Sequence, residues 1–487
     1  MKKKFITFFA VLLFIAFNLS AQNSFQVLFQ SSNDKTSSFI LEDNAGYFIL
    51  TGSEFDPIDS IAKNKIWKIS DSGDTSSYRI NLGDFRSYFS YIDNTSESTY
   101  LLFGASGDTL HRLSYHQLTI VQTDTVFNVQ WVKTFEIKED RNIVVRKVIK
   151  DDFGYYIVGQ IVDENTPGLY DPLFIRLNHA GDTIRTSITE GFEGDKPVHS
   201  AIFNSDSTGI WWFSDSPPSQ WGRQTRRTVD TLFNFLVQDT LMYKISSLMG
   251  AKHLSDSSFL LSCRYHINEA GQPDDDEIGI FLYNINLEEV AFNHFGAIDT
   301  LDYPGIAQGI DFKNPDTIYY AGMKNVIISF NPNGPSWILV GQLDANLQPR
   351  YQRIYGGDSY YMTLNVLATS DGGCLVSALL HNHEFDKDDL FIMKLNPEGL
   401  ITGTNPLIAP LRYAIVWPNP AMDILNVEYT EQEGELSIID INGRMILWQK
   451  IDKGRNIINI SHLPAGFYFY QILLQNQETQ SGKFIKL

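Results

Sequence analysis

One short pattern recurs about every 55 residues through most of this chain, and a fixed period of that size is typical of repeat architectures. The pattern is an acidic or small turn residue, then a run of aromatic and aliphatic residues, then a small residue. Seven segments carry it: 43–52, 97–104, 152–159, 206–214, 256–263, 316–322 and 371–378. Each repeat is therefore expected to form one supersecondary unit, and this period limits the folds open to the chain.

Two further types of short run accompany the pattern. The second type lies at 66–74, 173–182, 280–286 and 390–399 and ends in a turn rich in Asn, Asp or Gly; the third type lies at 131–135, 291–296 and 351–356. Apolar residues in these runs alternate with polar ones or follow one another without interruption, which is typical of strands. Each repeat therefore holds three or four short strands and almost no helical periodicity.

This organisation favours an all-β fold of about seven blades, a β-propeller, in which small antiparallel sheets pack radially. Leucine-rich repeats have a shorter period and helical solenoids need an apolar period near 3.6, so neither fits. Six or eight blades stay open. A string of β-sandwich domains is the alternative, and the lack of Pro/Ser-rich linkers between repeats argues against it. The repeat loosely resembles the divergent propellers of secreted Bacteroidetes proteins.

The first segment after the N-terminal region predicts how the ring closes. Residues 24–30 look like a run of the third type with no repeat before it. Because an isolated strand would leave an exposed edge, we expect it to join the last blade beside 390–395.

The N-terminus has the form of a secretory signal peptide. Three lysines, Lys2 to Lys4, precede an apolar run at 5–17, and Ala21 provides a small residue before the expected cut. The alternative, a membrane anchor, needs about 20 apolar residues, and this run is shorter. We therefore assign 1–21 to the signal peptide and 22–403 to the propeller-like domain, and predict no transmembrane span.

A second, smaller all-β module is expected after a linker at 404–412, which contains two prolines and no strand pattern. Residues 413–487 contain about seven short strand patterns, which suits a small β-sandwich. The predicted strands lie at 414–417, 424–429, 435–441, 445–450, 456–460, 467–474 and 480–487. Asn442-Gly443 is a strong signal for a tight hairpin.

The motifs of this module resemble the type A C-terminal sorting domain of Bacteroidetes type IX secretion cargo. The matching segments are 413–427, 435–444, 463–468 and 482–487, in the expected order at the end of the chain. An ordinary accessory sandwich is the alternative. By resemblance, the positions of the sorting signal are Pro418, Asn419, Pro420, Gly443, Leu463, Pro464, Gly466 and Tyr468.

The resemblance implies a route and partners. The chain is expected to pass through the periplasm and the outer membrane and to be secreted or displayed at the cell surface. Its partners would be the type IX secretion machinery and a sortase-like peptidase that removes the module.

Composition narrows the remaining functions. The formal net charge is −19, so the surface is expected to repel nucleic acid and anionic lipid. Two cysteines in 487 residues make no disulfide framework, and buried free thiols are the simpler interpretation of Cys263 and Cys374.

Two clusters have metal-ligand chemistry, although the common catalytic motifs are missing from the sequence. His381, His383 and Glu384 stand near three aspartates, 386, 388 and 389, and a polar loop between strands is the alternative. The run 274–277 (Asp-Asp-Asp-Glu) could hold Ca²⁺, but it lacks the EF-hand spacing, and a solvated acidic loop is the alternative. No resident metal or other cofactor is predicted.

One segment has the composition of a ligand-binding loop. Trp221, Arg223, Arg226 and Arg227 follow the Trp211-Trp212 strand pattern, and they combine a flat stacking surface with guanidinium donors. We place these four residues in the loop after that strand as a candidate site for an extracellular glycan or protein ligand.

These features predict a secreted or cell-surface, non-enzymatic propeller of the binding or adhesion type. A polysaccharide hydrolase or lyase is the first alternative and a structural surface component is the second, because propellers serve all three roles.

Overall fold

The structure is a computed structural model in which all regular elements are strands within the described part of the chain. The described residues are 24–31, 33–56, 61–83, 86–107, 115–137, 141–163, 170–189, 198–204, 208–215, 223–243, 245–267, 275–297, 300–326, 334–383, 386–402, 414–418, 420–441, 444–474 and 479–487. The expected signal peptide and the linker at 404–412 lie outside them. Among the described residues, no helix is long and apolar enough to cross a membrane.

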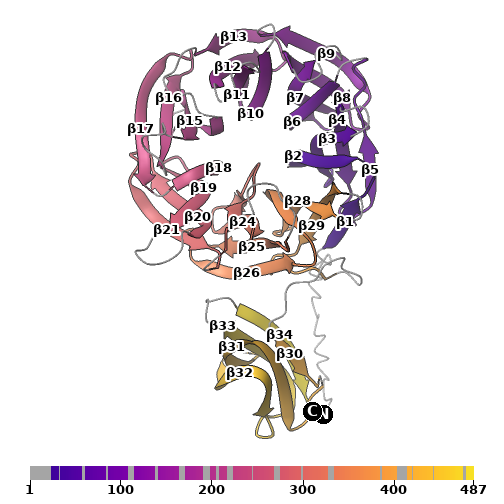
Figure 1. The fold of residues 1–487 in the computed structure, drawn as a ribbon, viewed down its shortest axis with the longest axis vertical. Coiled ribbons are helices and arrows are strands. Elements are labelled where there is room, and N and C mark those ends of the chain that lie inside the picture. The colour runs from indigo at the N-terminus through magenta and orange to yellow at the C-terminus, as the bar shows by residue number, and fades with distance from the viewer. Residues whose placement is uncertain are drawn as a thin grey trace, which may run out of the picture.

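Seven sheets form a ring of blades in the described residues (Figure 1), as the period predicted. Blade 1 holds β2 (Asp34–Glu42), β3 (Phe48–Asp56), β4 (Ile61–Ile69) and β5 (Thr75–Tyr78); blade 2 holds β6 (Arg86–Ser96), β7 (Thr99–Gly107), β8 (Gln117–Asp124) and β9 (Val129–Glu136); blade 3 holds β10 (Arg141–Asp151), β11 (Gly154–Asp163), β12 (Tyr170–Asn178) and β13 (Thr183–Ile188); blade 4 holds β14 (Val198–Phe203), β15 (Gly209–Asp215), β16 (Arg223–Asp230) and β17 (Phe235–Tyr243); blade 5 holds β18 (Ile245–Ser255), β19 (Ser258–Ile267), β20 (Asp275–Asn284) and β21 (Glu289–Phe295); blade 6 holds β22 (Tyr303–Pro304), β23 (Ile310–Asn314), β24 (Thr317–Lys324), β25 (Trp337–Leu343) and β26 (Pro349–Gly356); blade 7 holds β27 (Tyr361–Ala368), β28 (Cys374–Asn382), β29 (Lys387–Leu395) and β1 (Phe25–Phe29).

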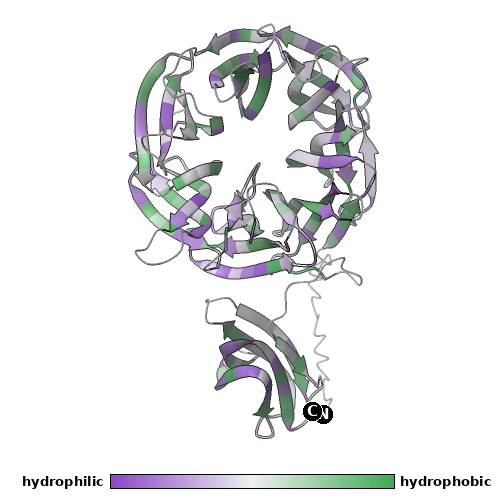
Figure 2. Ribbon diagram, in the orientation of Figure 1, coloured by the Kyte–Doolittle hydropathy of each residue, from purple (hydrophilic) through white to green (hydrophobic). Residues whose placement is uncertain are grey.

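The first strand of each blade lies toward the centre of the ring, and the last lies at its perimeter (Figure 1). In blade 6, the two short strands β22 and β23 both pair with β24 and together take the place of the first strand, so β24, β25 and β26 correspond to the second, third and fourth strands of the other blades. Hydrophobic and hydrophilic segments alternate along the strands of the blades, whereas the outer strand β26 is largely hydrophilic (Figure 2). Packing of neighbouring blades builds the core; one cluster, for example, joins Phe103 of blade 2 to Tyr155 and Ile157 of blade 3. Cys263 and Cys374 are free and buried, and burial raises the pKa of the Cys374 thiol to about 12.

The ring closes as predicted, with the N-terminal strand in the last blade. β1 pairs antiparallel with β29, from Phe25 opposite Lys394 to Phe29 opposite Leu390. The Ser24 hydroxyl also lies 2.8 Å from the Thr402 hydroxyl, so the two ends of the propeller are tied together. Closure therefore comes from the N-terminal side of the domain.

One turn geometry follows the third strand of every blade. Its first residue is Asp, Asn or Ser, its backbone N–H donates to the carbonyl four residues later, and its side-chain oxygen accepts the N–H of that same residue. The fourth residue has a positive φ. Short polar side chains stabilise such turns by binding the backbone. The first residues are Ser70, Asp124, Asn178, Asp230, Asn284, Asp344 and Asn396.

The small residue that ends each sequence repeat has a steric cause where that residue is glycine. It lies in the second strand, opposite the point where the first strand bulges or breaks. A Cβ at Gly52 or Gly104 would stand 1.9 Å from the carbonyl oxygen of Thr36 or Tyr88. The seven residues are Gly52, Gly104, Gly159, Ser214, Cys263, Gly322 and Ala378.

The C-terminal module has fewer strands than predicted. β30 (Ala414–Trp417), β31 (Ile424–Asp440), β32 (Met445–Asn459), β33 (Gly466–Leu474) and β34 (Thr479–Lys486) form one five-stranded sheet. The predicted strands at 424–429 and 435–441 form the single strand β31, and those at 445–450 and 456–460 form the single strand β32. The two long strands pair along almost their whole lengths, across a register shift after Tyr429. Both halves of β31 contribute to one buried core, so a single bent sheet encloses it. Asn442 and Gly443 lie outside the described residues.

Candidate functional site

A cavity of about 500 Å³ lies among the first strands of the blades, at the centre of the ring. We call it the central channel. A cavity of this size is within the range of sites for small ligands. Its walls include residues 38–42 of β2, 90–91 of β6, 145–150 of β10, 199–203 of β14, 250–253 of β18, 310–313 of β23 and Leu367 of β27.

β-Bulges shape the channel wall. Six first strands carry one extra residue at matching positions: Ser38, Ser90, Arg146, His199, Met249 and Leu364. A bulge bends its strand and re-aims the side chain, which is why bulges are common beside functional sites. Ser38, Ser90, Arg146 and His199 line the channel.

Arg146 and Lys147 are neighbouring cations on β10. Neither makes a hydrogen bond or an ion pair with the part of the chain that the structure describes. Desolvation lowers the pKa of Lys147; nearby Asp311 opposes that shift, and Lys252 adds to it. Desolvation likewise lowers the pKa of Arg146, although its side chain is exposed at the channel. The channel wall therefore carries two positive charges, on Arg146 and Lys147, that no carboxylate of the described residues pairs with.

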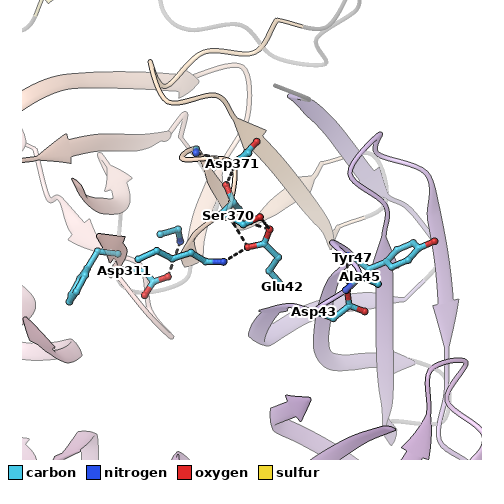
Figure 3. Close-up of polar contacts among 12 residues, drawn as sticks. Glu42, Asp43, Ala45, Tyr47, Asp311, Ser370 and Asp371 are labelled. Carbon is cyan, nitrogen blue, oxygen red and sulfur yellow. Dashed lines mark hydrogen bonds and ion pairs between the residues drawn. The ribbon is translucent and has the colours of Figure 1, made fainter. Parts of the chain in front are cut away.

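The two carboxylates of the channel wall are already occupied. Asp311 accepts from the Lys252 ammonium at 2.5 Å and from the Ala368 N–H at 2.8 Å. Glu42 lies 2.5 Å from the Lys313 ammonium and accepts the Ser370 N–H at 2.9 Å. Figure 3 shows Glu42 of β2 facing Ser370, with Asp311 on β23 of blade 6. Each carboxylate is thus matched by a lysine and held by a backbone amide.

Aromatic rings complete the wall. The rings of Phe39 and Tyr91, from adjacent blades, lie 4.5 Å apart between centroids. The His253 ring contacts the carbonyl oxygen of Phe203 at 2.6 Å. Rings, hydroxyls and cations therefore face the same space.

The predicted ligand-binding loop does not assemble as expected. Trp221 lies outside the described residues, and Arg223 begins β16. Arg226 and Arg227 belong to β16 itself, so their placement in the loop was wrong. Arg226 pairs with Asp239 at 2.5 Å and stacks on Trp211, while Arg227 is buried and stacks on Trp212. Both arginines hold strands of blade 4 together.

The acidic run is neither a solvated loop nor an open calcium site. Asp274 lies outside the described residues, and Asp275, Asp276 and Glu277 are buried at the start of β20. Asp276 pairs with Arg264 and with His266, and Glu277 accepts a contact from His294. Cationic and imidazole partners thus take the place that a calcium ion would need.

The histidine cluster is held by carboxylates. His381 Nδ1 lies 2.9 Å from Asp388, Nε2 lies 3.6 Å from Asp386, and the ring meets that of His383 edge-on. Glu384 lies outside the described residues. In the part of the chain that the structure describes, no three His, Cys, Asp or Glu side chains are grouped to hold a metal ion.

The expected sorting positions divide between core and surface. Leu463 and Tyr468 are buried; Tyr468 stacks on Phe484 and its hydroxyl donates to the Pro464 carbonyl at 2.9 Å. Gly466 begins β33, and Pro418 and Pro420 are exposed. Asn419, like Gly443, lies outside the described residues. The 463–468 motif therefore builds the module's core.

Comparison with known proteins confirms the sorting domain. Residues 415–487 match the family described as the secretion system C-terminal sorting domain. This segment indicates export to the cell surface or secretion, and interaction with the type IX secretion machinery. No curated protein matches the chain.

Solved structures similar to the chain are propellers and other proteins at low identity. The β-propeller domain of the Trilobed protease from Pyrococcus furiosus is 10% identical, with a TM-score of 0.40, covering 74% of this chain and 94% of that one. Drosophila Semaphorin 2a is 7% identical, with a TM-score of 0.48, covering 96% and 97%. The polysaccharide lyase Uly1 is 9% identical, with a TM-score of 0.41, covering 74% and 90%. At this distance, they carry no argument about activity.

Sequence reasoning missed the channel. It found the second, third and fourth strands of the blades but not the first, which supplies the wall. Arg146 and His199 stand 53 residues apart and Ser38 and Ser90 stand 52 apart, which is about one repeat in each case. Alignment of the repeats on their small residues could have revealed this series.

Proposed function

We propose that this chain, which ends in a type IX secretion sorting domain, is an exported propeller that recognises an extracellular ligand in its central channel. The cavity of about 500 Å³ among the first strands carries the proposal. Its wall combines rings, hydroxyls and cations, and binding sites are concave places where apolar surface meets a few fixed polar groups.

The state of the acidic groups favours binding over hydrolysis. Glycoside hydrolases use two carboxylates, one as an acid and one as a base or nucleophile. In the described channel wall, Glu42 and Asp311 are both matched by lysines and by backbone amides. Neither carboxylate can act as a nucleophile, an acid or a base in hydrolysis unless its ion pair with lysine first breaks.

The sorting domain gives the proposal its location. We take 22–403 as the functional unit, 404–412 as the linker and 413–487 as a module that a sortase-like peptidase removes. The closure between β1 and β29 supports this division, because the ring needs no strand from the C-terminal module.

A glycan and peptide array probed with the purified chain tests the proposal. Ser38→Trp places a large ring in the channel wall and should abolish the signal, whereas Ser98→Trp, in an exposed turn, should leave it unchanged. A signal that survives Ser38→Trp but is lost in Trp221→Ala would move the site to the segment of the chain that joins β15 to β16. A blank array with folded protein would refute the binding function, and the masses of the probes after incubation would show any turnover.

A further inference from the structure

We propose that the central channel binds the carboxylate of an acidic saccharide through Arg146 and Lys147. This inference rests on the proposed function and specifies the ligand class of the same site. Four features of the wall lead to it: the charge balance, the unpaired cations, the pair of tilted rings and the bulge hydroxyls.

The charge balance of the channel is opposite to that of the protein. The whole chain carries −19, yet the cavity wall has five lysine and arginine side chains and two carboxylates. Three of the five are matched: Lys150 lies 2.7 Å from Asp93, Lys252 is paired with Asp311, and Lys313 with Glu42. The described residues give Arg146 and Lys147 no such match.

A partly buried, unmatched cation is unfavourable until an anion arrives, and Lys147 is such a cation. Taking a charge out of water costs free energy unless it is paired, and the lowered pKa of Lys147 reflects that desolvation. Lys252 lies close enough to add repulsion. A carboxylate between the two β10 cations would relieve both effects, and guanidinium binds carboxylate in a bidentate way.

The rest of the wall fits a sugar ring. The Phe39 and Tyr91 rings, 4.5 Å apart, offer aromatic surface to the C–H face of a saccharide. The bulged Ser38 and Ser90, on the same two strands, add hydroxyls that both donate and accept. An acidic saccharide would use the rings, the hydroxyls and the cations together, whereas a simple inorganic anion would use only the cations.

The test is calorimetric titration of the purified chain with a galacturonate oligosaccharide and with its carboxyl-reduced, neutral counterpart. We expect the acidic form to bind at least about tenfold more tightly, because a hydrogen bond to a charged group is worth more than a neutral one. Arg146→Gln with Lys147→Gln should remove this preference. Arg185→Gln, on the exposed outer strand β13 of the same blade, removes one positive charge away from the channel and should retain it. The acidic ligand should also bind more weakly as salt rises.

The outcomes separate the inference from the proposed function. Equal or tighter binding of the neutral oligosaccharide would overturn the anion assignment and leave the binding function standing. A preference for the acid that survives in the double variant would overturn the assignment to Arg146 and Lys147. Equal binding of sulfate and the acidic oligosaccharide would overturn the saccharide class. Binding of no probe, together with a blank array, would overturn both proposals.

Discussion

Gly104 should be among the least replaceable residues of the propeller. A Cβ there would lie 1.9 Å from the carbonyl oxygen of Tyr88 and 2.8 Å from the Cα of Phe89. Both are backbone atoms of β6, which cannot rotate aside as a flexible side chain can. Gly104→Ala therefore has to push β6 away from β7, where the two strands form an antiparallel ladder.

The displacement would not stay within blade 2. The Tyr88 hydroxyl donates to the Ile143 carbonyl at 2.9 Å and accepts the Val145 N–H at 3.2 Å, so β6 is tied to the first strand of blade 3. Overpacking a well-packed core costs about 1–3 kcal/mol, and we place this substitution near 3 kcal/mol because only backbone can yield. Gly104 has no positive φ, so the effect is steric.

Urea unfolding of the purified chain, followed by tryptophan fluorescence, measures this effect. Gly334→Ala is the matched control, because a Cβ there meets nothing within 4 Å; it should change stability by less than about 0.5 kcal/mol. Gly104→Ala should lower the unfolding midpoint clearly at unchanged m-value. Equal midpoints for the two variants would refute the steric explanation of the repeat's small residue.

Three further predictions follow from the closure, a buried acid and the sorting domain. Deleting residues 22–30 should lower the melting temperature of the propeller through loss of the β1–β29 ladder, whereas deleting 404–487 should leave it unchanged; equal melting of the two truncations would contradict the closure. Burial raises the pKa of Asp302 to about 6, so the folded state binds its proton more tightly than the unfolded chain does, and unfolding free energy should fall as pH rises from about 4 to 6. Asp302→Asn should flatten that slope in urea titrations, and an unchanged slope would exclude Asp302 as its source. Exported protein should begin at about Gln22 and lack the module by intact mass, and retention of the module would count against processing.

The sequence pattern predicted the fold well where one physical constraint repeats. Glycine recurs at Gly52, Gly104, Gly159 and Gly322 because the bulged or broken first strand brings a carbonyl oxygen close to the second strand. The polar residue that opens each turn recurs because its side chain binds the same amide every time. Such local requirements leave a signal in any one copy of the repeat.

The channel and the strands of the terminal module were harder to predict because no single physical constraint repeats there. First-strand residues at the same level differ, as Ser38, Arg146 and His199 show, since facing a cavity imposes no common chemistry. In the terminal module, β31 continues through a run of polar residues at which the apolar pattern of a strand ends, so the sequence predicted two strands there. Arg226 and Arg227 look like loop residues in the sequence but stack on Trp211 and Trp212 from the next strand. The periodicity of one sequence does not show which strands pair with each other, or how far from the centre of the ring a residue lies.

The closure of the ring also determines how the domain would carry mechanical load. Tension applied at the C-terminal end reaches β29, which lies between β28 on one side and β1 on the other. Extraction of β29 along its own direction would shear both ladders at once, a geometry in which many hydrogen bonds share the force. A strand at the sheet edge would peel away bond by bond. A propeller closed from its N-terminal side is therefore suited to being pulled from its C-terminal end.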